Sequence, residues 1–196
     1  MSSMPDLPTT LQLLCHPATP APMVGSVSVT VDFQTTHVVF SFCLRGDMAR
    51  LRIPPEKNPA RADLLWEHTC FEVFVSYEGD PAYREFNFST SGQWAAFDFL
   101  EYRSRTQEDP AVPAPSISTR LTEGRLELNA VVPLSALPAN PAGKTLQTGI
   151  SAVIEAADTV DGAHSYWALK HPSPHPDFHH RAGHSLELPH SSHAGI

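Results

Sequence analysis

Polar side chains alternate with aromatic ones in the middle of the chain, and their types suit recognition of a small polar ligand. Glu72, Glu85 and Asn87 place carboxyl and amide groups in strand-like segments, and Arg103 adds a guanidinium group. Such groups bind hydroxyls through directional hydrogen bonds, whereas an indole ring can stack on the apolar face of a sugar. We therefore predict a ligand-binding face here, with a sugar as the best candidate ligand.

The stacking ring that we predict is Trp94. If Thr90 and Ser91 form a two-residue hairpin loop, Asn87 lies opposite Trp94, and Glu85 lies one step along the same face. Trp66 and Trp167 are further stacking candidates, and His171 or Trp167 would border the pocket. The predicted ligand-binding set is therefore Glu72, Glu85, Asn87, Trp94, Arg103, Trp167 and His171.

A purely structural interpretation of these residues stays open. Either glutamate, Glu72 or Glu85, could form an ion pair with Arg84 or Arg103 on a partly solvated sheet. The tryptophans could equally belong to the core of the fold, where large aromatic side chains are common.

The sequence contains no motif that indicates catalysis. GxSxG, HExxH, the Walker loop and GxGxxG are all absent. Glu72 and Glu85 could act as a glycosidase pair only if their carboxyl groups were about 5 Å or about 6.5–9.5 Å apart. We predict a non-catalytic binding protein with no catalytic residues, and we keep a glycoside hydrolase as the lesser alternative.

Histidines gather near the C-terminus, where seven of the eleven follow Trp167. Their spacing matches no zinc motif, and the prolines between them prevent a helix that would align them. We predict that the 171–184 loop holds no tightly bound metal and that the protein needs no cofactor. The cysteines, which form no CxxC pair, are expected to be reduced and buried: Cys15, Cys43 and Cys70.

Short alternating segments separated by proline and glycine predict an all-β fold, an antiparallel β-sandwich with few or no helices. A single helical turn is expected before Trp66 and a short 3₁₀ turn near residue 135. The expected strands are Thr10–His16, Val24–Phe33, His37–Arg45, Met48–Ile53, Thr69–Ser76, Tyr83–Ser89, Gln93–Phe99, Ile117–Leu121, Arg125–Val132, Thr148–Ala157, Ser165–Leu169 and Ser185–Leu188. Because Phe71, Phe86, Phe88 and Phe97 share one parity on three of them, we predict that these rings are buried together.

Length and charge bound the remaining expectations. A chain of 196 residues suits one domain, predicted over residues 10–188 with disordered termini at 1–9 and 189–196. The net charge of −8 disfavours nucleic acid and anionic membranes as partners. No apolar run reaches the length of a membrane span, and no secretory signal is visible, so a cytoplasmic location is expected. The oligomeric state is open.

Three segments, LLWEHTCFEVFV, YREFNFSTSGQWAAFDF and SYWALKHPSPHPDFHHR, resemble bacterial DOMON-like proteins related to family 9 carbohydrate-binding modules. The resemblance implies an antiparallel β-sandwich with a ligand site on or beside one sheet. Some DOMON relatives bind haem through methionine and histidine, so a haem- or metal-binding redox domain is a second alternative. Met48 and His171 would be the residues to test for it.

Overall fold

The computed structural model describes residues 10–140, 142–158 and 163–188, and the predicted disordered termini lie outside these ranges. The described residues form antiparallel strands and four 3₁₀-helices of one turn each, which confirms the predicted all-β class. The strands are β1 (Thr10–Cys15), β2 (Val24–Phe33), β3 (His37–Gly46), β4 (Cys70–Tyr77), β5 (Tyr83–Ser89), β6 (Trp94–Glu101), β7 (Ser104–Arg105), β8 (Ser116–Thr122), β9 (Arg125–Pro133), β10 (Leu146–Glu155), β11 (His164–Ala168) and β12 (Leu186–Leu188). The helices are η1 (Met48–Arg50), η2 (Leu65–Glu67), η3 (Leu134–Ala136) and η4 (Arg181–Gly183).

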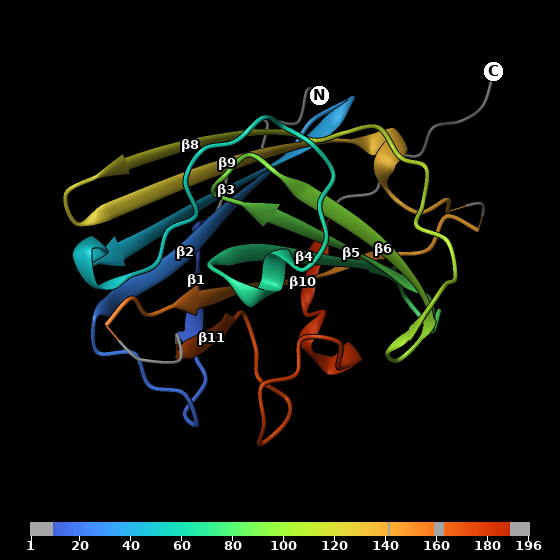
Figure 1. The fold of residues 1–196 in the computed structure, drawn as a ribbon. Coiled ribbons are helices and arrows are strands. Elements are labelled where there is room, and N and C mark those ends of the chain that lie inside the picture. Colours follow the sequence, from blue (N-terminus) through green and yellow to red (C-terminus); the bar gives the residue numbers. More distant parts are fainter. Residues whose placement is uncertain (1–9, 141, 159–162, 189–196) are drawn as a thin grey trace, which may run out of the picture.

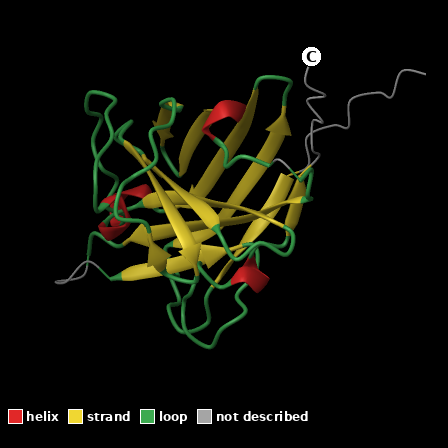
Figure 2. Cartoon of the chain, turned by 90° about the vertical axis from the view of Figure 1, so that its right-hand side faces the viewer, coloured by secondary structure: helices red, strands yellow, loops and turns green. Residues whose placement is uncertain are grey.

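The strands form two layers that share one strand. Sheet A has the order β1-β2-β3-β9-β8, and sheet B has the order β7-β6-β5-β4-β10-β11-β1, with β12 added beside β10. The first half of β1 pairs with β2, and its last residues, Leu14 and Cys15, pair with β11. The layers are seen in Figure 1, and Figure 2 shows their strands crossing one another. None of the short helices in the described ranges could cross a membrane.

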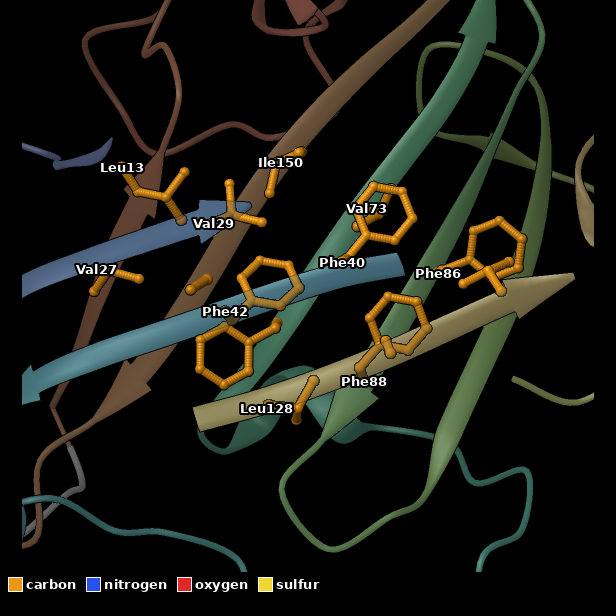
Figure 3. Packing of buried hydrophobic residues seen from close by; sticks show 14 of the residues in the cluster. Leu13, Val27, Val29, Phe40, Phe42, Val73, Phe86, Phe88, Leu128 and Ile150 are labelled. Atoms are coloured by element: carbon orange, nitrogen blue, oxygen red, sulfur yellow. The ribbon is translucent and has the colours of Figure 1, made fainter. Parts of the chain in front are cut away.

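The core lies between the two sheets and follows from strand alternation. Every second side chain of a sandwich strand points inward, so apolar residues at alternate positions share the same layer. Phe40 and Phe42 of sheet A pack against Phe71 and the other inward rings of sheet B, and the ring centroids of Phe42 and Phe71 are 4.7 Å apart. Figure 3 shows Phe40 and Phe42 of sheet A together with Phe86 and Phe88 of sheet B between the layers.

The hairpin between β5 and β6 has a three-residue loop, so the predicted two-residue loop is wrong. Gly92 takes a left-handed conformation (φ 86°), and its N–H donates to the Ser89 carbonyl. A residue without a side chain beyond hydrogen adopts that conformation without strain. The extra loop residue shifts the register by one, so that Asn87 lies opposite Ala95 and not opposite Trp94.

This shift places two aromatic side chains on the opposite faces from those predicted. Trp94 lies opposite Phe88 and belongs to the main core, 6 % exposed. Phe97 is buried as predicted, but on the outer face of sheet B, in a second cluster with Phe74 and Phe99. A one-residue slip exchanges the faces of every side chain in a strand.

The segment predicted as a strand at Met48–Ile53 is instead the 3₁₀-helix η1 followed by an isolated bridge from Leu51 to Ala156. The two prolines that follow Ile53 cannot donate to a ladder, which limits pairing at this point. The expected turn before Trp66 forms as η2, and the expected 3₁₀ turn forms as η3.

Candidate ligand-binding site

A cavity of about 620 Å³ lies on the outer face of sheet B, away from the sandwich core. Its base is formed by outward side chains of β4, β5, β6, β10 and β11, and its border by the η2 segment, the β6–β7 turn and the loop that follows β11. The apolar lining consists of Trp66, Phe97, Phe99, Val153, Tyr166, Pro176 and Phe178. The polar lining consists of Thr19, Glu72, Glu85, Arg103, Arg105 and His179.

Aromatic rings form two sides of this cavity. On one side the half-buried Trp66 packs edge-on against Phe97, with ring centroids 5.7 Å apart and an interplanar angle of 78°. On the other side Tyr166 packs against Phe178, with centroids 5.9 Å apart. Phe97 and Tyr166 point outward because side chains alternate along a strand and their neighbours in sequence point into the core. The cavity therefore offers apolar ring surface around a polar base.

Two buried carboxyl groups form that base. Glu72 and Glu85 are 4 % and 6 % exposed and stand on neighbouring antiparallel strands, as diagonal partners on one face. Asn87 lies directly opposite Glu72, is fully buried, and donates from Nδ2 to Glu85 Oε1 over 2.7 Å. Asn87 thus lies beneath the cavity and orients Glu85 without lining the space itself.

Burial sets the protonation of the two carboxyls. It raises the pKa of Glu85 to about 7, against the lowering effect of the Asn87 hydrogen bond and of the arginines Arg105 and Arg103. The pKa of Glu72 is raised well above its usual range by burial and by the charge of Glu85, with only Ser151 lowering it. Burial therefore favours the protonated form of both carboxyls.

A hydrogen-bonded chain runs from the β6–β7 turn through Tyr83 to His179, which lies beside Glu85. The backbone N–H of Arg103 donates to Tyr83 Oη (3.1 Å), and that hydroxyl lies 2.8 Å from His179 Nδ1. The other ring nitrogen of His179, Nε2, is 3.8 Å from Glu85 Oε2. Burial and the charge of Arg103 lower the pKa of His179 to about 4, so its imidazole is neutral at pH 7. A neutral ring gives Glu85 no compensating charge.

The two arginines of the lining are each held by an aspartate. Arg103 Nη2 is 3.0 Å from Asp177 Oδ1, and Arg105 Nη2 is 2.6 Å from Asp109 Oδ1. The Arg105 guanidinium also lies over the ring of Phe97, 3.8 Å from its centroid. Asp109 also pairs with Arg61, at 3.5 Å from Nη1 to Oδ2, so Arg105 shares its aspartate with a second arginine.

Backbone strain is found at two points of the border. Among the described residues, Leu64 (φ 57°) and Arg103 (φ 55°) are the non-glycine residues with positive φ. Leu64 immediately precedes the η2 turn that carries Trp66, and Arg103 itself lines the cavity. Left-handed conformations of this kind cost energy in residues with a Cβ and are typical of ligand-binding segments.

The structure separates the predicted site residues into three groups. Glu72, Glu85 and Arg103 line one cavity together with Trp66, and Asn87 supports them from below. The predicted face of Trp94 is wrong, because the hairpin register turns its indole into the core.

Trp167 and His171 lie away from the cavity lining. Trp167 also belongs to the main core, where its indole N–H donates to Ser165 Oγ. His171 lies near β1, where its Nε2 is 2.7 Å from the Leu14 carbonyl oxygen. The outward neighbour of Trp167 on β11, Tyr166, occupies the cavity in its place.

The ion-pair interpretation of the glutamates is wrong for both arginines that it named. Arg84 pairs with Asp98, 2.6 Å from Nε to Oδ1, and Arg103 pairs with Asp177. Glu72 and Glu85 are therefore left facing the cavity, with neither arginine as a direct partner.

Three cavity residues were not among the predicted site residues: Tyr166, Phe178 and His179. They lie in the SYWALKHPSPHPDFHHR segment, which carries part of the family resemblance and contains part of the histidine-rich loop. In the structure their rings pack on the outer face of sheet B, with the centroids of His179 and Phe99 5.0 Å apart. The sequence feature that could have identified these residues is the presence of aromatic side chains in a proline-rich loop, which indicates that the loop packs against a sheet.

The histidine-rich loop has other partners in the described residues. His184 Nδ1 lies 3.0 Å from Ser76 Oγ and 2.8 Å from Arg181 Nη1. Within the described ranges, no group of three or more His, Cys, Asp or Glu side chains is arranged to hold a metal ion. Met48 packs against the main core, whereas His171 contacts the β1 backbone. His190 and His193 lie outside the described residues.

No protein-family model matches the sequence, and no curated protein matches it. Solved structures do match the fold. A candidate carbohydrate-binding protein from Bacteroides uniformis superposes with a TM-score of 0.66 at 19% identity, covering 89% of this chain and 83% of its own. A family 9 carbohydrate-binding module from Caldicellulosiruptor kristjanssonii, solved with cellotriose, has a TM-score of 0.50 at 11% identity, covering 94% and 87%. At these identities the likeness shows a shared β-sandwich fold.

Proposed function

We propose that this protein is a non-catalytic module that binds a small carbohydrate in the cavity on the outer face of sheet B. The observation that carries the proposal is the pairing of buried carboxyl groups with aromatic walls in one cavity. Sugars present hydroxyl groups around their edges and C–H groups on their faces, so they need both kinds of surface at once.

The polar groups of the cavity fit a ligand that donates and accepts hydrogen bonds. Glu85, which Asn87 orients, accepts from hydroxyls, and the guanidinium of Arg103 donates to them. Trp66 stands half-buried at the border, where its ring remains available for stacking. A volume of about 620 Å³ lies within the usual range for small-molecule pockets and suits one or two sugar rings.

Two further observations support the proposal. The described neighbours in fold include a family 9 module bound to cellotriose and a candidate carbohydrate-binding protein. The motif resemblance to DOMON-like proteins, which we retain as part of the proposal, implies a ligand site in the same region of the fold.

Calorimetric titration with a panel of mono- and disaccharides tests this function. We expect at least one neutral or charged sugar to bind wild-type protein, and Trp66→Ala to abolish that binding while leaving the far-UV circular dichroism spectrum unchanged. The control is Leu121→Ala, which removes an exposed apolar side chain of β8 that does not line the cavity. Failure of the whole panel to bind would contradict the proposal.

The glycosidase alternative is separated by a second measurement. Glu72 and Glu85 face one cavity with unequal pKa values, an arrangement that acid–base catalysis also uses. We expect no hydrolysis of aryl-glycosides by the purified protein. Turnover that disappears in both Glu72→Gln and Glu85→Gln would assign the protein to hydrolases instead.

A further inference from the structure

We propose that the cavity selects sugars that carry a protonated amino group over their neutral counterparts. This inference rests on the proposed carbohydrate-binding function and names the ligand class within it. It follows from the absence of a basic partner for the two glutamates, from their open oxygen atoms at the floor of the cavity and from the rings around it.

The two glutamates at the floor of the cavity have no basic side chain paired with them. Arg103 pairs with Asp177, and Arg105 shares Asp109 with Arg61, so neither lining arginine is paired with a glutamate. Within the described residues, neither Glu72 nor Glu85 has a lysine or arginine in direct ion-pair contact. The nearest basic group to Glu85, the imidazole of His179, is uncharged near neutral pH.

Acceptor atoms without a matching donor remain at the base of the cavity. Glu72 accepts from Ser151 at Oε2 over 3.3 Å, and its Oε1 has no hydrogen-bond partner in the described part of the chain. Glu85 Oε1 is occupied by Asn87, whereas its Oε2 lies 3.8 Å from His179, beyond hydrogen-bond distance. One oxygen of each glutamate on this face is thus free to contact a ligand.

An ammonium group of a ligand can form more hydrogen bonds with the two glutamates at the floor of the cavity than a hydroxyl can. A hydroxyl donates one hydrogen bond, whereas an ammonium donates three and brings the positive charge that buried carboxylates lack. A ligand cation between the two carboxyls would favour their ionised forms and so lower the pKa values that burial has raised. The geometry of diagonal partners on neighbouring strands lets both groups approach one cation.

The walls and the overall charge favour a cation as well. Aromatic faces attract cations, and Trp66 and Tyr166 border the same space as the carboxyls. The net charge of −8 raises the local concentration of cationic ligands around the molecule. A neutral polyol gains nothing from either effect.

The decisive experiment is a titration with matched sugars that differ at one position. The probes are the methyl glycosides of glucosamine and galactosamine, their N-acetyl derivatives, and the corresponding neutral glucosides and galactosides. At a pH where the amine is protonated, we expect the amino sugar to bind about tenfold or more tightly than both counterparts. The N-acetyl compound keeps the nitrogen and removes the charge, so it isolates the ammonium.

Two variants and one control locate the effect. Glu85→Gln and Glu72→Gln replace the carboxyls with near-isosteric amides, and each is expected to reduce the preference for the amino sugar at least severalfold. Glu78→Gln makes the same change in net charge at an exposed residue outside the lining, and its preference should equal that of the wild type. A preference that survives both cavity substitutions would overturn the assignment.

The possible outcomes distinguish a failure of this inference from a failure of the proposed carbohydrate-binding function. If neutral sugars bind as tightly as amino sugars, the carbohydrate-binding function stands and the inference fails. If no sugar binds, the proposed function fails and takes the inference with it. If methylammonium or putrescine binds and no sugar does, the cavity is an amine site without a sugar, which also overturns the inference.

Discussion

Trp94 and Phe88 lie opposite one another across the β5–β6 hairpin, with both side chains in the core between the sheets. The Arg61 guanidinium lies over the indole, 4.9 Å from its centroid. The cavity indole is that of Trp66, from a different segment and on the other side of sheet B.

Trp94→Ala is therefore expected to reduce the free energy of unfolding by about 3–5 kcal/mol, because it leaves a large void in a packed core. The folded fraction should keep its affinity for sugar. Urea denaturation and a titration of the folded protein measure the two effects. Trp66→Ala should give the reverse result, a small change in stability with loss of binding. Equal effects of the two substitutions would refute this division of roles.

The raised pKa of Glu85 predicts a pH-dependent contribution to stability. Its pKa is about 7 in the folded protein and 4.5 when unperturbed, so the native state binds more protons between these values. Stability from this group is complete below about pH 4.5 and decreases as the pH rises to about 7. Relative to Glu85→Gln, the wild type should lose up to about 3 kcal/mol across this window.

Two histidines make the stability increase as the pH rises, opposite to the effect of Glu85. The wild type must therefore be compared with Glu85→Gln. Burial lowers the pKa of His179 to about 4 and that of His184 to about 3, so their contributions are lost as the pH falls below 6.5. Both histidines are present in wild type and variant, and their effects largely cancel in the difference. If the unfolding free energy of the wild type increased toward pH 7 relative to that of Glu85→Gln, Glu85 would not be buried as described.

Asn87 provides a test of how the base of the cavity is oriented. Asn87→Ala removes the hydrogen bond that lowers the pKa of Glu85, so that pKa should increase further. Carbon-detected NMR titration of the glutamate side chains measures it. Asn129→Ala, at an exposed position of β9, is the matched control and should leave the Glu85 titration unchanged. A Glu85 pKa that stays the same or falls in Asn87→Ala would contradict the orienting role.

Gly149 marks a close approach between β10 and the segment after β11. A Cβ at this position would lie 2.8 Å from Cδ2 of His184, whose ring is buried and bonded to Ser76 and Arg181. Gly149→Ala should therefore cost about 1–3 kcal/mol of unfolding free energy. Thermal and urea denaturation measure it, with Gly25→Ala as control, where the nearest atom is 3.4 Å away. Equal stability of the two variants would contradict the packing.

The strands and their inward faces could be predicted because a half-buried strand repeats every two residues. That rule correctly identified Phe71, Phe86 and Phe88 as buried, since they lie within strands whose register needs no loop to define it. It failed for Trp94, because the face of β6 depends on whether the preceding loop has two residues or three. The Thr90–Gly92 loop contains the deciding glycine, but Ser-Gly is compatible with either length.

Only some of the residues that line the cavity could be predicted from the sequence. Glu72 and Glu85 belong to strands that are close in sequence, so their shared face follows from parity and pairing. Tyr166 and Phe178 reach the same space only through the pairing of β11 with β10 and the return of the following loop. No local pattern specifies which distant loop will cover an open sheet face.

The sharing of β1 between the two sheets has a consequence for the order in which the molecule assembles during synthesis. Strands β2 and β3 are adjacent in sequence and can pair as soon as they leave the ribosome, and β4, β5 and β6 can follow. The last residues of β1 must wait for β11, about 150 positions later, before the second sheet closes. The cavity walls from Tyr166 onward arrive with that same late segment. A nascent chain therefore leaves Glu72 and Glu85 uncovered until the final strands are made, and the cavity is completed last.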